Sequence, residues 1–147
     1  MRGFSKLAMD KTSLEAANAV GRESFPGHMG IQFTSLDPAC VEAEFEITNA
    51  HMAPNGFLHG ASVVALADTI AGFANVLNLP EGAGGFTTIE LKTNYLGTAR
   101  KGVIHGAGTP VHLGHSTQVW DVKVSRASDD KAIAMFRCTN MILWPKP

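Results

Sequence analysis

The run from Gly60 to Leu77 constrains the fold of this chain more than any other stretch. It contains no proline, and its polar side chains are only those of Ser62, Asp68, Thr69 and Asn75. The run is long enough for a helix of about 27 Å, and Asn78 followed by Pro80 supplies stop signals. A helix that is apolar on nearly all sides is buried, so the sequence predicts a central helix surrounded by the rest of the chain.

Asp68 stands in the middle of this predicted helix. The positions one turn away on either side are occupied by Val64, Ala65, Ala71 and Gly72, so no basic side chain of the helix can pair with the carboxylate. A buried carboxylate without a partner is costly. Either another part of the fold gives Asp68 a hydrogen-bond donor, or the group is there for chemistry.

Composition indicates an ordinary soluble domain, expected to comprise all of residues 1–147. The chain is 45% hydrophobic and 17% charged, with a formal net charge of -1, which gives no electrostatic case for a nucleic-acid partner. The apolar run is slightly short for a membrane span and carries a central acid, so membrane insertion is not expected. Residues 1–13 lack the long apolar region of a secretory signal. We expect a cytoplasmic protein with Cys40 and Cys138 as reduced, buried thiols.

The segments around the run show one further helical pattern and six strand patterns. Residues 1–11 are expected to form a loose arm, and the capping-box spacing of Thr12-Ser13-Leu14-Glu15 predicts a helix to about Glu23. Apolar and polar residues alternate in strand fashion over residues 30–36, 41–47, 87–95, 103–113, 117–126 and 132–144. Gly106, Gly108 and Pro110 predict a bulge or a sheet edge within the fourth of these.

The order of the elements indicates the fold class. A helix and two strands precede the long helix, and four strands joined by short turns follow it, which favours antiparallel pairing. One antiparallel sheet wrapped around a very apolar helix is an α+β fold. Because the far side of the helix is apolar too, a second copy of the chain is the simplest cover, and we expect at least a dimer.

Three short motifs carry a family resemblance. They are Asn55-Gly56-Phe57-Leu58-His59-Gly60-Ala61, then Leu66-Ala67-Asp68-Thr69, then Thr87-Thr88-Ile89-Glu90-Leu91 with Asn94-Tyr95-Leu96. Together they resemble the hotdog-fold acyl-CoA thioesterases, in particular the PaaI-like (phenylacetate-degradation) and 4-hydroxybenzoyl-CoA thioesterase group, over roughly residues 28–143. The resemblance implies a hotdog fold and hydrolysis of an acyl-CoA, with an aromatic or a medium-chain acyl group as the candidates. It implies no metal or redox cofactor, with coenzyme A entering only as part of the substrate.

The resemblance also implies roles for individual residues. The backbone N–H of Gly60, which follows His59, would polarise the thioester carbonyl, and Asp68 would act as general base or nucleophile. Thr88 would help to hold the water or the acid. The group often has Asn or Gln six residues before the histidine, where this chain has Ala53. Asn55 or His51 could substitute there, and Ala61 replaces the second glycine of the usual His-Gly-Gly.

Elementary chemistry supports this site and adds a constraint. The first turn of a helix offers unpaired N–H groups to the oxygen of an attacked carbonyl, and one such donor contributes about 3 kcal/mol to the rate. A carboxylate can attack the carbonyl or deprotonate a water. Gly60 and Asp68 are about 12 Å apart along one helix, too far to reach one reacting centre. We therefore expect a homodimer, or a dimer of dimers, with Gly60 and Asp68 of one site on different subunits.

Each residue of the helix site also has a structural interpretation. Asp68 could be bonded to backbone or to Thr88, which would make it a structural acid. His59 could cap the helix or fill a gap as readily as take part in catalysis. Thr88 could be an ordinary strand threonine.

Charged residues in the turns are candidates for binding the phosphates of coenzyme A. Arg100, Lys101 and His115 are the residues concerned, and an ordinary solvated turn is the alternative. His112 and His115 have a metal-like spacing, but no third ligand is apparent, so a turn is expected rather than a metal site.

Two functions other than thioester hydrolysis stay open. One is a non-catalytic acyl-CoA-binding sensor, against which Asp68 argues, because binding alone does not need a buried acid. The other is a hotdog hydratase or dehydratase acting on acyl thioesters, which would use a catalytic His paired with an acid. The central helix contains no histidine.

Overall fold

A computed structural model describes residues 13–146. The helical elements are α2 (Leu14–Gly21), α3 (Phe25–His28), the 3-10 turn η1 (Asn49–His51) and α4 (Gly60–Leu77). The strands are β1 (Gln32–Asp37), β2 (Cys40–Glu46), β3 (Gly85–Tyr95), β4 (Val103–Leu113), β5 (Thr117–Arg126) and β6 (Ala132–Leu143). The predicted long helix and all six predicted strands are present, and α3 and η1 are short additions. The predicted arm, residues 1–11, lies outside the described residues.

The predicted first helix ends earlier than expected. Ser13 is its N-cap, and its side chain accepts a hydrogen bond from the Ala16 N–H at 3.2 Å. The helix ends at Gly21 instead of Glu23, because the hydroxyl of Ser24 donates to the Gly21 carbonyl at 3.0 Å and turns the chain into α3. The expectation of two buried thiols is also half wrong, since Cys138 is buried but Cys40 is only half-buried.

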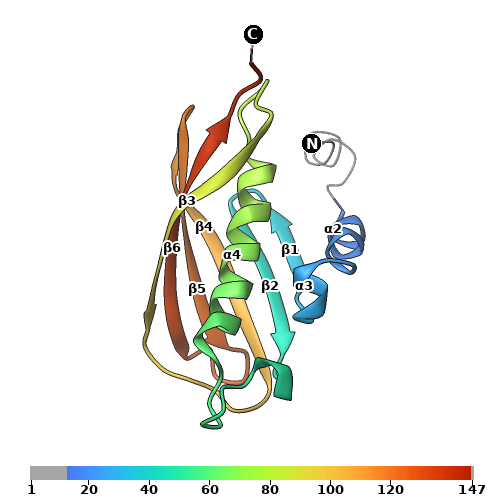
Figure 1. Ribbon diagram of the computed structural model, residues 1–147, viewed down its shortest axis with the longest axis vertical. Coiled ribbons are helices and arrows are strands. Elements are labelled where there is room, and N and C mark those ends of the chain that lie inside the picture. Colours follow the sequence, from blue (N-terminus) through green and yellow to red (C-terminus); the bar gives the residue numbers. More distant parts are fainter. Residues whose placement is uncertain (1–12, 147) are drawn as a thin grey trace.

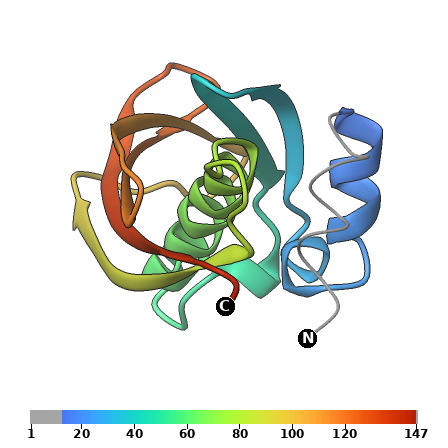
Figure 2. The ribbon, with the colours of Figure 1, turned by 90° about the horizontal axis from the view of Figure 1, so that it is seen from above.

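All six strands form one antiparallel sheet in the order β1-β2-β4-β5-β6-β3. The sheet curls around α4, as Figure 1 shows from the side and Figure 2 from above. This is the predicted α+β fold with one long helix inside a curved sheet. The register shifts between Pro110 and His112, which confirms a bulge. The expected edge is also present locally, because β2 pairs only with Val103–Gly108, so Pro110 has a strand partner on the β5 side alone among the described residues.

Glycines in β4 allow α4 to pack directly on the sheet. A Cβ at Gly106 would lie 2.5 Å from Ile70 Cδ1, and one at Gly108 would lie 2.6 Å from Ile70 Cγ2. Ile70 and Leu66 are fully buried against this surface. By length and composition α4 could cross a membrane, but such a helix is weak evidence of a span, and half of it is buried inside this fold.

The two edges of the sheet differ. At the β1 edge, the side chain of Asn18 in α2 forms hydrogen bonds with both backbone groups of Phe33. Its Oδ1 accepts from the Phe33 N–H at 2.7 Å, and its Nδ2 donates to the Phe33 carbonyl at 3.2 Å. At the other edge, β3 has a neighbour on one side only within the described chain. Its side chains are open to solvent, with Ile89 56% and Tyr95 53% exposed. An uncovered edge strand of this kind is a surface for pairing with another chain.

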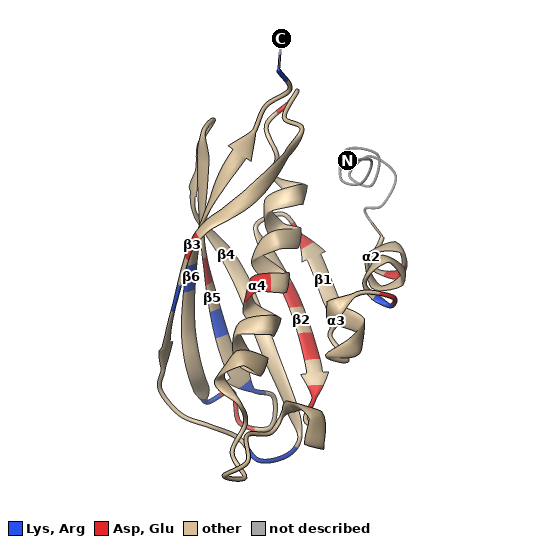
Figure 3. Ribbon diagram, viewed as in Figure 1, with Lys and Arg blue, Asp and Glu red and all other residues tan. Residues whose placement is uncertain are grey.

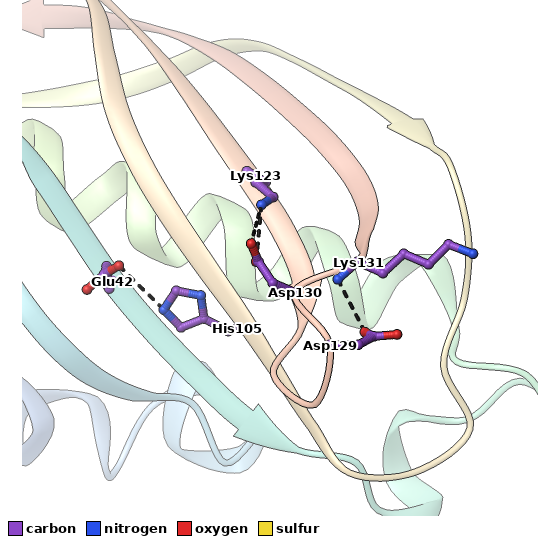
Figure 4. A network of polar contacts seen from close by, with 6 residues as sticks. All are labelled: Glu42, His105, Lys123, Asp129, Asp130 and Lys131. Atoms are coloured by element: carbon purple, nitrogen blue, oxygen red, sulfur yellow. Dashed lines mark hydrogen bonds and ion pairs between the residues drawn. The ribbon is translucent and has the colours of Figure 1, made fainter.

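Figure 3 marks charged residues on several strands and on the loops that join them. Strand β2 has an acidic face, because Glu42, Glu44 and Glu46 alternate with buried residues. His105 of β4 lies 3.6 Å from the Glu42 carboxylate, and Lys123 lies 3.1 Å from Asp130 (Figure 4). On α4 the single acidic band in Figure 3 is Asp68.

Candidate active site

The first turn of α4 presents an unpaired backbone donor. His59 is the N-cap, and its Nδ1 accepts the Ala61 N–H at 3.0 Å. The capping interpretation of His59 is thereby confirmed, and the imidazole is exposed to solvent. Gly60 is the first helical residue, and no described residue accepts its N–H. A helix N-terminus with a free N–H is suited to stabilising negative charge on an oxygen.

Tyr95 holds this first turn in place. Its hydroxyl donates to the Gly60 carbonyl at 3.0 Å. A Cβ at position 60 would lie 2.7 Å from the tyrosine oxygen and 2.9 Å from Cζ. A side chain at position 60 would therefore force the Tyr95 ring to move. Tyr95 was expected only as part of a motif, because a contact across 35 positions leaves no local signal in the sequence.

The loop before α4 is held by its own polar groups. His51 is 3% exposed. Its Nδ1 accepts the Thr48 N–H at 2.9 Å and its Nε2 donates to the Met29 carbonyl at 2.9 Å. Since both ring nitrogens are engaged, the expectation that His51 substitutes for a missing amide at Ala53 is wrong. Asn55 is exposed, and its Oδ1 accepts the Phe57 N–H at 3.2 Å in a local turn.

Asp68 is half-buried and makes no side-chain hydrogen bond or ion pair with any residue in the range 13–146. Burial raises the pKa of its carboxyl group above the ordinary value. Burial also raises the pKa of the Cys138 thiol to about 12, and the charge of Asp68 adds to this shift. No described residue bonds to the Asp68 carboxylate, so the structural alternative of a carboxylate bonded to Thr88 or to backbone is not what is found.

Thr88 lies on the side of β3 that faces α4. It pairs in register with Asn140 of β6, which is fully buried, and cross-strand partners point to the same face of a sheet. A Cβ at Gly72, one turn after Asp68, would lie 3.5 Å from the Phe86 ring, so the start of β3 passes beside this part of the helix. The fold thus brings Thr88 to the same side of α4 as Asp68, without a hydrogen bond between them.

The turn after β3 carries cationic side chains next to the start of α4. An open pocket of about 490 Å³ is lined by Arg100, Lys101 and neighbouring residues of this turn and of the β5–β6 hairpin. Arg126, in the same wall, is paired with Asp129, whereas Arg100 and Lys101 form no ion pair within the described chain. The Arg100 guanidinium lies 4.6 Å above the Phe57 ring.

His115 is not part of this pocket. It lies in the β4–β5 hairpin, whereas Arg100 and Lys101 precede β4, so the length of that strand separates them. Its ring stacks on Trp144 at a centroid distance of 4.2 Å. The three candidate phosphate ligands are therefore not brought together within one chain. Among residues 13–146, no three His, Cys, Asp or Glu side chains are grouped so as to hold a metal ion.

The fold and the site define a class of protein. A curved antiparallel sheet encloses one long helix, whose first N–H is free and whose central acid has an environment that disfavours its charge. This arrangement of sheet and helix is the hotdog fold.

Comparison with known proteins gives the family. Residues 55–133, more than half of the chain, match the model of the thioesterase superfamily. The chain is 33% identical to the 1,4-dihydroxy-2-naphthoyl-CoA hydrolase of Escherichia coli over 78% of its length and 83% of that protein. It is 33% identical to the proofreading thioesterase EntH of Klebsiella pneumoniae, over 76% of its length and 81% of that protein. The chain belongs to the thioesterase superfamily and is a thioester hydrolase.

A solved structure supports the same assignment. The thioesterase HI1161 from Haemophilus influenzae superposes with a TM-score of 0.85 at 30% identity, covering 91% of this chain and 92% of that one. The predicted hotdog fold is thereby confirmed over nearly the whole described chain.

Proposed function

We propose that this protein hydrolyses an acyl-CoA thioester to a free acid and coenzyme A. The observation that carries the proposal is Asp68: a half-buried carboxyl group with a raised pKa and no ion-pair partner among the described residues, on a helix whose first N–H is free. A carboxylate whose pKa is raised is a stronger base than an ordinary surface carboxylate. Carboxyl groups with perturbed pKa values are found mostly at functional sites.

The reaction follows from these groups. The Gly60 N–H, at the positive end of the helix dipole, donates to the carbonyl oxygen as negative charge develops there. A water oxygen then bonds to the carbonyl carbon while Asp68 takes its proton. The C–S bond breaks, and the departing thiolate of coenzyme A takes up a proton. Direct attack by Asp68, followed by hydrolysis of the resulting anhydride, uses the same groups.

The open pocket next to Gly60 is the proposed site for the phosphates of coenzyme A. Arg100 and Lys101 are both exposed, and guanidinium and ammonium groups bind phosphate through charge-assisted hydrogen bonds. The Leu58 N–H donates to the Ala99 carbonyl at 3.2 Å, which ties this turn to the chain two residues before Gly60. One extended substrate can therefore reach from the phosphate pocket to the helix start.

We also propose that two copies of the chain build each site, in a homodimer or a dimer of dimers in the cytoplasm. Gly60 and Asp68 lie eight residues apart on α4, about 12 Å along the axis, and one thioester carbonyl cannot contact both. The uncovered edge of β3 and the exposed side chains of Ile89 and Leu91 offer the surface for a second copy.

Thiol release from a panel of short-chain, long-chain and aromatic acyl-CoAs, for wild type and Asp68→Asn, tests the proposal. We expect rapid release with one class of substrate and a loss of orders of magnitude in Asp68→Asn. Arg100→Ala and Lys101→Ala are expected to raise KM for acyl-CoA but not for a short acyl thioester that lacks the nucleotide. Tight binding of acyl-CoA without turnover would contradict hydrolysis and identify a sensor.

A further inference from the structure

The edge strand β3 carries two charges of opposite sign that have no counter-ion within the described chain. Glu90 and Lys92 are both exposed, and neither forms an ion pair with a described residue. Their partners in register on β6 are Thr139 and Arg137, which alternate with buried residues of that strand. Cross-strand partners point to the same face of a sheet, so both charges lie on the outer face.

The position of Lys92 is electrostatically unfavourable in a single chain. Its partner in register is a second cation, Arg137, and like charges directly opposite each other on one face of a sheet repel. Asp121 does not relieve this repulsion, because its two oxygens accept from Arg137 at 2.6 and 2.7 Å. The described sheet has no strand beyond β3. An anionic partner for Lys92 can therefore come from a chain on the open side of β3.

A second copy of the chain supplies that anion if β3 pairs antiparallel with itself. In two copies related by a twofold axis, the residue on the axis faces itself, and residues equally far before and after it face each other. An axis at Glu90 would bring two glutamates together, and an axis at Lys92 would bring two lysines together. With the axis at Leu91, Glu90 of each copy faces Lys92 of the other. Of these three registers, the one centred on Leu91 pairs opposite charges, and it does so twice.

The contacts of α4 place the axis in the same part of β3. If the two helix groups of one site come from two chains, the axis passes level with their midpoint, about 6 Å along α4 from Gly60. At one end of β3, Tyr95 bonds to Gly60. At the other end, Phe86 lies beside Gly72, about 18 Å further along the helix. The midpoint is therefore about a third of the way from Tyr95 to Phe86, within about one residue of Leu91.

The side of β3 that faces α4 is apolar and uncovered near this point. Leu91 is in register with the buried Cys138, yet it is 44% exposed, and its neighbour Ile89 is 56% exposed. In the register centred on Leu91, the two Leu91 side chains meet on the axis, which removes apolar surface from water. The same pairing thus satisfies the charges on the outer face and covers leucine on the inner face.

We propose that two copies of this chain join through β3 in a register centred on Leu91, held by reciprocal ion pairs between Glu90 of one copy and Lys92 of the other. The inference rests on the proposed function and deepens it, because this register brings Gly60 of one copy level with Asp68 of the other. Both α4 helices then lie antiparallel on one side of a joined sheet. The alternating charges of the edge select a second copy of this chain as the partner.

Charge reversal tests the register. Glu90→Lys makes both positions cationic, and Lys92→Glu makes both anionic, so each variant repels a copy of itself at both pairs. One chain of each kind forms two attractive pairs. Glu46→Lys is the matched control: it makes the same charge change at an exposed position of β2, away from β3 in the sheet. Sedimentation velocity gives the dimer Kd, and thiol release at the same concentrations reports complete sites.

We expect Kd to rise about tenfold or more in each single variant, with a parallel loss of thiol release at low concentration. An equal mixture of the two variants is expected to return to within about threefold of wild type in both measurements. Glu46→Lys is expected to match wild type. A chain with both charges exchanged, Glu90→Lys with Lys92→Glu, is expected to dimerise more tightly than either single variant, which separates loss of pairing from loss of folding.

Three results would overturn the register. They are an unchanged Kd in the single variants, a mixture that dimerises no more tightly than its components, and a wild-type protein that stays monomeric. Dimers that follow the charge pattern but release no thiol from any acyl-CoA would leave the register standing and would refute the proposed hydrolysis instead.

Discussion

Replacing Gly60 with proline tests the helix N-terminus as the donor to the thioester oxygen. Proline removes the Gly60 N–H, which no described residue accepts. The backbone accommodates the change, because Gly60 is the first helical residue, where proline is favoured. His59 also has φ -68° and ψ 133°, the conformation preferred before proline.

Alanine at the same position is the matched control. Both substitutions add a Cβ that would lie 2.7 Å from the Tyr95 oxygen and 2.9 Å from its Cζ. The ring must move, at a cost of about 1–3 kcal/mol in stability, and the loss of its hydrogen bond to Gly60 costs about 1 kcal/mol more. Alanine carries this cost but keeps the N–H. Removal of one oxyanion donor lowers kcat by about 10²–10³.

Thiol release and urea unfolding of the two variants separate these contributions. We expect similar losses of stability in Gly60→Ala and Gly60→Pro, and a kcat at least about 100-fold lower in the proline variant than in the alanine variant. Equal kcat values in the two variants would refute the assignment of the Gly60 N–H as the donor.

Three further predictions concern stability. Burial raises the pKa of Asp68 in the folded protein, so ionisation of Asp68 destabilises the fold. The unfolding temperatures of wild type and Asp68→Asn should therefore be alike at about pH 3. As the pH rises through the raised pKa, wild type should become less stable than Asp68→Asn. A wild-type protein as stable as the variant at neutral pH would contradict this. His51→Leu removes hydrogen bonds to two part-buried backbone groups, and urea unfolding should show a loss of about 1–3 kcal/mol, whereas an exposed role for His51 predicts almost none. Gly106→Ala places a Cβ 2.5 Å from Ile70 Cδ1 and should lower the free energy of unfolding by about 1–3 kcal/mol. Ile70→Val deletes that methyl group, so additive losses of stability in the double mutant would show that this contact is not the cause.

The elements that the sequence predicts correctly are those set by local patterns. The apolar run of α4 and its stop signals do not depend on knowing what surrounds the helix. The alternation in β2 directly reports one buried and one solvated face. Glycine and proline indicate both the bulge in β4 and the local edge at Pro110, but which strand leaves that stretch uncovered depends on strand order, which a single strand does not reveal.

The parts of the site that depend on long-range contacts were not predictable in the same way. Tyr95 reaches Gly60 across 35 positions. His115 was grouped with Arg100 because both are charged turn residues. Turn composition does not say at which end of a sheet a turn lies, and the structure puts them at different ends of β4.

The central claim, that Gly60 and Asp68 of one site come from different chains, is tested most directly by mixing two inactive variants. Gly60→Pro and Asp68→Asn are each purified, then unfolded and refolded together in equal amounts. A dimer containing one chain of each kind has one intact site and one doubly defective site. Random pairing in twofold-symmetric dimers predicts recovery of about a quarter of the wild-type activity. If both groups of a site belonged to one chain, every site would keep a defect, and the mixture would stay inactive.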